Sequence, residues 1–264
     1  MRASSRACSR SSATVSSTSD PVVSSLYLRE DLLVTLVGQR LSIVGAEAKH
    51  AATVNRTRPG EVVAIGNGRG LVATGRVVSA TPSELTIEVD AVEHAKRPSP
   101  MLTLAQALAK GDRDELAVQA STELGIDVVI PWAAERSVSR WEGPKVAKGR
   151  ERWSAIAREA AKQSIRPWVP EVGELLTSKQ LPALAAAIRM LVLEPTAVTP
   201  LTAIRPDGRD IVVVVGPEGG LTDGELTRFA DAGAELVRLG DTVLRTSTAG
   251  PAAIAVLNAG LGRW

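Results

Sequence analysis

The segment 211–225 constrains the fold of this chain more than any other stretch. It reads Ile-Val-Val-Val-Val and continues as Gly-Pro-Glu-Gly-Gly-Leu-Thr-Asp-Gly-Glu. Five consecutive large apolar residues are typical of a strand that is buried on both faces of a parallel sheet. Thr222 and Glu225 have the spacing of a capping box, which marks the start of a helix. The segment therefore predicts a buried strand, a glycine-rich turn and then a helix.

Alternating strands and helices are predicted from residue 101 to residue 264. Apolar or β-branched runs indicate strands at 101–108, 127–132, 190–193, 211–215 and 236–239. Helical spacing of apolar residues indicates helices at 114–124, 148–164, 181–188, 223–232 and 247–261. Proline is tolerated only in the first helical turn, so Pro251 places the start of the last helix near Thr248. The alternation predicts an α/β domain at 101–264 with a mostly parallel sheet.

The preceding segment, residues 25–95, has a different pattern. Short β-prone runs separated by turn residues predict strands at 26–28, 41–44, 61–65, 71–78 and 85–89, with one helix at 46–56. This pattern is typical of a small β-barrel or open sandwich. The two prolines in Lys-Arg-Pro-Ser-Pro indicate a linker at 96–100. We expect two domains, at 25–95 and 101–264.

The first 24 residues are rich in serine and arginine and contain one acidic residue, Asp20. Such a composition favours a disordered tail, although a start codon assigned too early and an organellar targeting segment stay open. The longest strongly apolar run in the chain, 211–215, is far too short to span a bilayer. We therefore expect no membrane association.

Cysteine and histidine are scarce. The chain has one cysteine, Cys8, and two histidines, His50 and His94. One cysteine excludes an internal disulfide framework and zinc sites built from several cysteines. Two histidines leave little room for a histidine-rich metal centre or a catalytic triad, so we expect no bound metal.

Polar loops follow three of the predicted strands, after Leu193, Val215 and Leu239. In open α/β sheets, ligands bind beyond the carboxyl ends of the strands, so these loops predict one cleft. The residues alone leave open a tight strand–helix connection without a ligand, and a solvated strand-end acid at Glu194. The glycine-rich loop lacks both the G-x-G-x-x-G and the Walker pattern, which argues against a nicotinamide or nucleoside triphosphate site.

These loops carry a resemblance to a known family. The motifs L-x-L-E at 191–194, G-P-E-G-G at 216–220 and L-G-x-x-x-L-R-T-x-T-A at 239–249 resemble the SPOUT methyltransferases. In particular they are similar to the RsmE type, which methylates N3 of a uridine in 16S ribosomal RNA. Further matches over residues 25–264 are Gln106–Leu108, Lys110–Arg113, Thr122–Gly125, Glu135–Val138, Arg152-Trp153, 159–164 with Arg166, His50, and Arg58–Glu61.

Two positions depart from the family pattern. Ser247 stands where the family often has an acid between the two threonines. Gly250 and Pro251 interrupt the usually alanine-rich start of the last helix. If the missing acid carries a proton in the family, that role is vacant here; a structural role for that acid is favoured.

The resemblance implies a PUA-like RNA-binding β-domain followed by a SPOUT α/β domain with a C-terminal trefoil knot. It also implies that S-adenosylmethionine is the cofactor and that the reaction is an in-line displacement at its methyl group. The matching positions around that cofactor are Leu193, Glu194, Gly216, Pro217, Glu218, Gly219, Gly220, Leu239, Gly240, Leu244 and Thr246.

Arg245 is the predicted catalytic residue, because a guanidinium can stabilise negative charge that develops on a uracil carbonyl. The sequence identifies no general base. Glu218 is one candidate, but a structural acid that closes its loop is favoured.

The formal net charge of +2 conceals a local excess of positive charge. Residues 136–168 carry +6, with three tryptophans among the basic residues. Basic residues interleaved with aromatic ones favour an RNA-binding surface, although Trp153 is expected in the core. The predicted RNA contacts are Arg136, Arg140, Lys145, Lys148 and Arg166.

The resemblance implies a cytoplasmic homodimer whose substrate is 16S ribosomal RNA in the small ribosomal subunit. Two alternatives stay open: a SPOUT relative that modifies another RNA, and a non-catalytic RNA-binding ribosome assembly factor.

Overall fold

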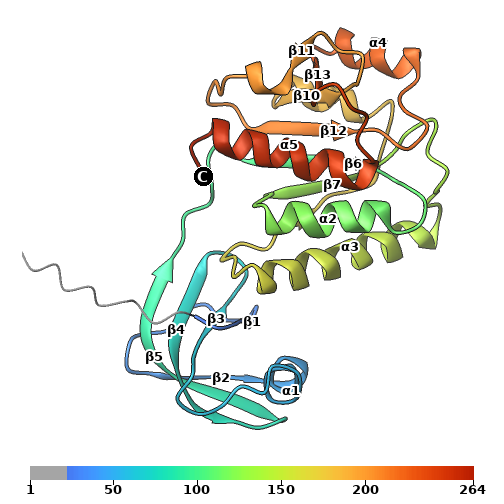
Figure 1. Ribbon diagram of the computed structural model, residues 1–264. Coiled ribbons are helices and arrows are strands. Elements are labelled where there is room, and N and C mark those ends of the chain that lie inside the picture. The colour runs from blue at the N-terminus through green and yellow to red at the C-terminus, as the bar shows by residue number, and fades with distance from the viewer. Residues whose placement is uncertain (1–22) are drawn as a thin grey trace, which may run out of the picture.

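The computed structural model describes residues 23–264, so all but the last two residues of the predicted tail at 1–24 lie outside the described residues. A small N-terminal domain and a larger C-terminal domain are joined by one extended segment (Figure 1). This segment, residues 95–101, contains neither helix nor strand and includes the predicted linker. Among residues 23–264, no helix is both long enough and apolar enough to cross a membrane.

The N-terminal domain is a five-stranded mixed sheet with the order β1-β3-β4-β5-β2. β1 is parallel to β3, and the other pairs are antiparallel. Alternate residues of the strands, such as Ile65 and Ile87, fill the core together with Tyr27. This confirms the small β-domain. The elements are β1 (Leu26–Leu28), β2 (Arg40–Val44), α1 (Gly45–Thr53), β3 (Val62–Gly66), β4 (Leu71–Ala80) and β5 (Glu84–His94).

The C-terminal domain has an eight-stranded sheet with the order β11-β13-β10-β12-β6-β7-β8, and β9 pairs with β7. Every pairing in it is parallel, which confirms the α/β class. The strands are β6 (Leu102–Ala107), β7 (Val128–Ala133), β8 (Glu171–Val172), β9 (Leu176–Thr177), β10 (Arg189–Leu193), β11 (Thr199–Pro200), β12 (Ile211–Val215) and β13 (Glu235–Arg238).

Helices cover both faces of this sheet. One face packs against α2 (Arg113–Glu123), α3 (Pro144–Gln163) and α5 (Thr246–Gly260) (Figure 1). The other face packs against α4 (Asp223–Asp231) and the 3-10 helix η1 (Leu181–Ala186), while the 3-10 helix η2 (Leu201–Ala203) contacts α5. In β12, Val213 and Val215 join the first core, and Val212 and Val214 join the second. Burial on both faces explains why the run 211–215 is continuously apolar.

Three helix predictions need correction. α3 begins at Pro144 rather than near 148, and the segment near 181–188 forms a 3-10 helix instead of an α-helix. The predicted start of the last helix near Thr248 is wrong, because α5 begins at Thr246 and contains Pro251 in its second turn. Since proline has no amide hydrogen, the carbonyl of Ser247 loses its usual helical partner at this position. Packing of α5 against the sheet outweighs that loss.

Contacts besides the linker hold the two domains together. Glu47 of α1 accepts hydrogen bonds from Arg158 and Lys162 of α3, at 2.9 and 3.0 Å. Backbone hydrogen bonds also join 68–70 to 167–169. The helix α3 is therefore an element of the C-terminal domain that also anchors the N-terminal domain.

Candidate functional site

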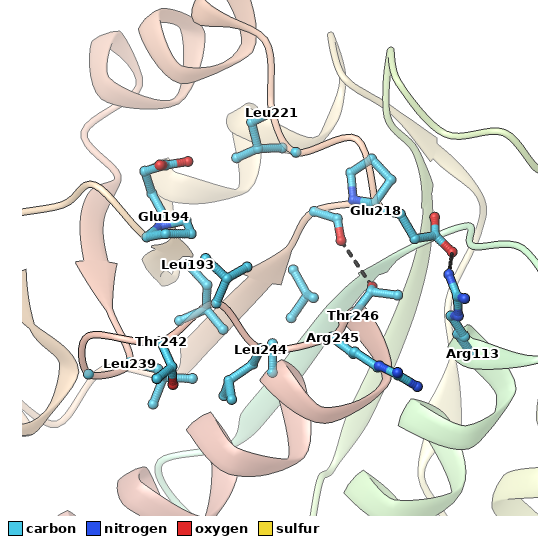
Figure 2. A pocket seen from close by; sticks show the side chains of 18 residues that line it. Arg113, Leu193, Glu194, Glu218, Leu221, Leu239, Thr242, Leu244, Arg245 and Thr246 are labelled. Carbon is cyan, nitrogen blue, oxygen red and sulfur yellow. Dashed lines mark hydrogen bonds and ion pairs between the residues drawn. The ribbon is translucent and has the colours of Figure 1, made fainter.

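A cavity of about 390 Å³ lies at the carboxyl ends of β10, β12 and β13 (Figure 2). The three polar loops that the sequence singled out meet there, as the parallel sheet order requires. Ten of the eleven predicted cofactor residues line it. The exception is Gly219, whose carbonyl accepts a hydrogen bond from Arg136 at 3.1 Å. The lining residues among the predicted set are Leu193, Glu194, Gly216, Pro217, Glu218, Gly220, Leu239, Gly240, Leu244 and Thr246.

The glycine-rich loop after β12 is a defined turn. The amide of Gly220 donates to the carbonyl of Pro217 at 2.9 Å, and Gly220 has a φ of +69°, which favours glycine. The predicted capping box is confirmed: the Thr222 hydroxyl accepts from the Glu225 amide, and the Glu225 carboxylate accepts from the Thr222 amide. The loop therefore runs from a buried strand into a capped helix.

Two side chains fix the last carbonyls at the end of β12. The indole Nε1 of Trp132 donates to the carbonyl of Val215 at 3.1 Å. The hydroxyl of Thr246, at the start of α5, donates to the carbonyl of Gly216 at 3.0 Å (Figure 2). Thr246, a predicted cofactor residue, lines the cavity. Its hydroxyl hydrogen, however, is donated to the carbonyl of Gly216.

The Glu218 carboxylate is held by groups of another loop. Its Oε1 accepts from the Lys110 amide and from the Arg113 guanidinium, both at 3.0 Å. Burial alone raises the pKa of Glu218. Hydrogen bonds from its own amide, from Lys110 and from Arg113 outweigh burial and hold that pKa below its usual value of 4.5. A carboxylate with a lowered pKa is a weak base, so this geometry favours the structural role for Glu218.

Arg245 is the residue that precedes the first turn of α5. Its guanidinium forms no hydrogen bond or ion pair with any residue between 23 and 264, although the residue lines the cavity. Figure 2 shows its side chain on the same side of the cavity as Arg113. Five guanidinium hydrogens are therefore available to a bound molecule.

Arg113 lines the cavity, although its sequence motif alone predicted no role for it. It starts α2, directly after the loop that follows β6. Because β6 lies beside β12 in the sheet, the loops after both strands reach the same edge. The sequence feature that could have identified Arg113 as a cavity residue is its position just after a strand of the parallel sheet.

Glu194 follows β10 and closes a turn with one of its oxygens. Oε1 accepts from the amide of Thr196 at 3.1 Å and from its hydroxyl at 2.8 Å. Oε2 accepts no hydrogen bond from any described residue. Glu194 therefore has a free acceptor at the edge of the cavity.

The predicted RNA contacts are in different environments. Arg136 and Arg140 are exposed and each donates to two backbone carbonyls. Lys145 and Lys148 are exposed on the first turns of α3, and none of the described carboxylates lies within 4.0 Å of either. These four residues stay predicted RNA contacts.

The prediction for Arg166 needs correction. Its side chain is 12% exposed and donates to the carbonyls of Thr122 and Ile126, at 2.9 and 2.7 Å. The guanidinium is directed into the protein, where it supports the turn between α2 and β7. Arg166 is therefore not part of the RNA surface that we propose.

Much of the basic segment 136–168 is also committed to internal contacts. Trp153 is buried, as expected, and Trp141 packs edge-on against it with 5.2 Å between ring centroids. Trp168 donates to the carbonyl of Ala95. The exposed basic residues of this segment without a carboxylate partner among the described residues lie between 136 and 148. Carboxylates pair with four basic residues beyond position 148: Arg150, Arg152, Arg158 and Lys162.

Metal-ligating side chains do not gather anywhere in the part of the chain that the structure describes. No group of three or more histidine, cysteine, aspartate or glutamate residues there is arranged to hold a metal ion.

Comparisons with known proteins agree with this geometry. A family model described as an RNA methyltransferase domain matches residues 96–258, and one described as an RNA methyltransferase PUA domain matches residues 43–90. The chain is 40% identical over 226 residues to a Mycobacterium bovis protein named ribosomal RNA small subunit methyltransferase E. That match covers 83% of this chain and 86% of the relative. A Bacillus subtilis protein of the same name is 33% identical, over 79% and 85% of the two chains.

Solved structures give the same result. A ribosomal RNA small subunit methyltransferase E from Neisseria gonorrhoeae, bound to S-adenosylmethionine, superposes with a TM-score of 0.78 at 30% identity. It covers 89% of this chain and 97% of its own. A methyltransferase from Legionella pneumophila in complex with the same cofactor has a TM-score of 0.76 at 29% identity, over 89% and 96% of the two chains. The chain belongs to the ribosomal RNA small subunit methyltransferase E family.

Proposed function

We propose that this protein methylates N3 of a specific uridine in the 16S ribosomal RNA of the small ribosomal subunit, with S-adenosylmethionine as the methyl donor. The observation that carries this proposal is the cavity at the ends of β10, β12 and β13. It brings together a glycine-rich turn, a Glu194 oxygen that accepts no hydrogen bond from a described residue, and Arg245, whose guanidinium has no partner between residues 23 and 264. The family relationship and the cofactor in two relatives agree with it.

The residues of the cavity fit S-adenosylmethionine. Leu193, Leu239 and Leu244 provide apolar surface for a flat base, and the amides of residues 240–245 donate no hydrogen bond to a described residue. Such amides suit the polar edges of adenine, and the free oxygen of Glu194 suits a ribose hydroxyl. The volume lies within the usual range of about 300–1,000 Å³ for ligand sites. When bound, the cofactor supplies an electrophilic methyl group on a sulfonium.

The protein contributes position and charge to this reaction. Attack by N3 of uracil requires loss of the N3 proton, which leaves negative charge on the ring carbonyls. Arg245 has no partner among the described residues, so its guanidinium is free to donate to one of these carbonyl oxygens. Arg113 is already neutralised by Glu218, which makes Arg245 the stronger candidate for this role.

The substrate surface extends from this cavity along residues 136–148. Arg136 donates to the carbonyls of Gly219 and Leu221, so its exposed side chain lies directly beside the loop after β12. Arg140, which precedes α3, and Lys145 and Lys148, on its first turns, continue the positive charge. Their contacts would be to phosphates, which fix the register of the RNA without reading its sequence. We infer that the PUA domain holds a second part of the RNA.

The proposal also includes a homodimer in the cytoplasm, where the small subunit is assembled. Size-exclusion chromatography with light scattering tests the dimer: a monomer at micromolar concentration would contradict it.

Two measurements test the proposed activity from independent directions. Calorimetric titration with S-adenosylmethionine is expected to show binding; its absence at millimolar ligand would indicate a non-catalytic assembly factor. Nucleoside analysis of ribosomal RNA after gene deletion is expected to show loss of 3-methyluridine from 16S ribosomal RNA. Loss of another modified nucleoside, or of one from another RNA, would indicate a different substrate.

A further inference from the structure

A buried hydrogen-bond relay joins β6, α5 and β12 beside the cavity. Gln106, near the end of β6, is fully buried and does not line the cavity. Its Nε2 donates to the carbonyl of Ala107 at 3.2 Å and to the hydroxyl of Thr246 at 2.9 Å. The Thr246 hydroxyl in turn donates to the carbonyl of Gly216 at 3.0 Å. Three segments that are far apart in the sequence are thus tied together at one point.

The direction of the relay follows from the donors and acceptors available. The carbonyl of Gly216 can only accept, so it takes the single hydroxyl proton of Thr246. The Thr246 oxygen must then accept from Gln106, and the Ala107 carbonyl must accept as well. Both hydrogens on Nε2 are therefore used, which excludes the flipped orientation of the Gln106 amide.

The other end of the Gln106 amide is left without a partner. Its Oε1 is buried and accepts no hydrogen bond from the described residues. An unpaired buried acceptor destabilises a protein, and a local violation of this kind is expected where function requires a particular side chain. An apolar residue of similar length would fill the same space without this penalty.

We propose that Gln106 is a positioning residue for methyl transfer, an inference that rests on the function proposed above. Thr246 directly follows Arg245, and Gly216 begins the loop 216–220. The relay fixes the backbone that carries Arg245 relative to the loop that faces the cofactor. Displacement of a reacting group by about 1 Å can lower a rate about 100-fold, so this distance matters for catalysis.

The relay also defines how Thr246 acts. Its hydroxyl proton is committed to Gly216, and one lone pair accepts from Gln106. The side chain of Thr246 therefore holds the two cavity walls together, and Gln106 acts through it without touching the cofactor.

The test uses near-isosteric variants of the full-length protein. Gln106→Met removes the donor, and Gln106→Glu keeps the shape but replaces the donor with an acceptor, which draws the Thr246 proton away from Gly216. Thr246→Val removes the hydroxyl, and Thr246→Ser restores it. Thr103→Val is the matched control, because Thr103 is a buried residue of the same strand without a side-chain hydrogen bond to a described residue.

We expect Gln106→Met, Gln106→Glu and Thr246→Val each to lower the single-turnover rate by at least about tenfold, with KM for the small subunit unchanged within about twofold. Thr246→Ser should recover most of the rate that Thr246→Val loses. The double variant Gln106→Met/Thr246→Val should be no slower than the slower single variant, because both break one relay. In calorimetry, Kd for S-adenosylmethionine should rise by about fivefold, as expected for a lost neutral hydrogen bond.

Rates and cofactor affinities equal to those of Thr103→Val would overturn the inference, as would multiplicative effects in the double variant. If Gln106→Met is unfolded at the assay temperature, Thr246→Val and Thr246→Ser probe the same relay. If the unmodified protein transfers no methyl group, the proposed function fails, and the cofactor affinities of the same variants still decide whether the relay shapes the cavity.

Discussion

Arg113 and Glu218 form an ion pair beside the cavity, with 3.0 Å between the guanidinium Nη1 and the carboxylate Oε1 (Figure 2). Arg113 begins α2, and Glu218 lies in the loop after β12, so the pair joins two loops that follow neighbouring strands. The amide of Lys110 donates to the same carboxylate oxygen. Glu218 therefore holds the loop 216–220 against the loop after β6, and its charge is used to hold Arg113.

The ion pair between Arg113 and Glu218 is expected to contribute to the stability of the fold in a pH-dependent way. The folded-state pKa of Glu218 is lowered from 4.5, so its ion pair stabilises the fold above that pH. The contribution is lost as the pH falls through the folded-state pKa. Thermal unfolding of the unmodified protein and Glu218→Gln should differ at neutral pH, and the difference should disappear as the pH falls below 4.5 and through the folded-state pKa. A difference that is independent of pH would contradict the assignment.

The same variant tests whether Glu218 removes the N3 proton. Loss of a general base lowers a rate about 10²–10⁴-fold, whereas loosening of a loop has a smaller effect. We expect kcat of Glu218→Gln to fall by less than about tenfold, with most of the change in cofactor affinity. A loss of kcat above about 100-fold at unchanged cofactor affinity would identify Glu218 as the base.

Arg245→Lys tests stabilisation of charge on the uracil ring. Lysine keeps the positive charge but loses the planar fork of donors. Removal of one well-placed donor to a developing oxyanion lowers kcat about 10²–10³-fold, so we expect a loss approaching about 100-fold with cofactor binding intact. Arg113→Lys is the comparison, since Arg113 is already paired with Glu218. Turnover of Arg245→Lys near that of the unmodified protein would refute this role.

The positive surface at residues 136–148 predicts a salt-dependent RNA affinity. Replacement of Arg140, Lys145 and Lys148 by glutamine should lower the affinity and reduce the log–log salt slope by roughly one unit per lost phosphate contact. Arg152→Gln is the control, because Arg152 lies on α3 with Lys145 and Lys148 but is paired with Glu115 at 2.9 Å. A filter-binding series over salt concentration measures both. An unchanged slope in the triple variant would exclude these residues from the interface.

Substitution of Glu47, which lies at the domain interface, is expected to destabilise the protein. Burial raises its pKa, but hydrogen bonds from Lys162 and Arg158 outweigh burial and lower it. Glu47→Gln leaves the 4%-exposed Lys162 with Glu159 alone and should lower the free energy of unfolding by about 1–3 kcal/mol.

Urea denaturation measures this change. Glu115→Gln, which breaks the more exposed pair with Arg152, serves as the comparison and should cost less than about 1 kcal/mol. An equal decrease in the free energy of unfolding in the two variants would argue against a stabilising role for the contacts of Glu47 between the domains.

Features that depend on nearby residues were predictable from the sequence. The continuous apolar run of β12 and the capping box of Thr222 and Glu225 are both confirmed, because each depends on residues close together in the chain. The convergence of three loops followed from the rule for parallel sheets and the family resemblance. The trefoil knot implied by that resemblance stays a prediction.

Features set by tertiary contacts were not predictable. Arg166 has the charge of an RNA contact, but its partners are carbonyls about 40 residues earlier in the chain. Pro251 is accepted within α5 because the helix packs tightly on the sheet, where Gly250 faces Leu104. Gln106 and Thr246 are 140 residues apart, and no local pattern links them.

Methyl transfer to isolated small ribosomal subunits that lack the modification, followed by mass spectrometry of the nucleosides, measures the proposed activity itself. We expect one 3-methyluridine per 16S ribosomal RNA with the unmodified protein and S-adenosylmethionine, and a much slower reaction with Arg245→Lys. No methylation, or methylation of a different nucleoside, would contradict it.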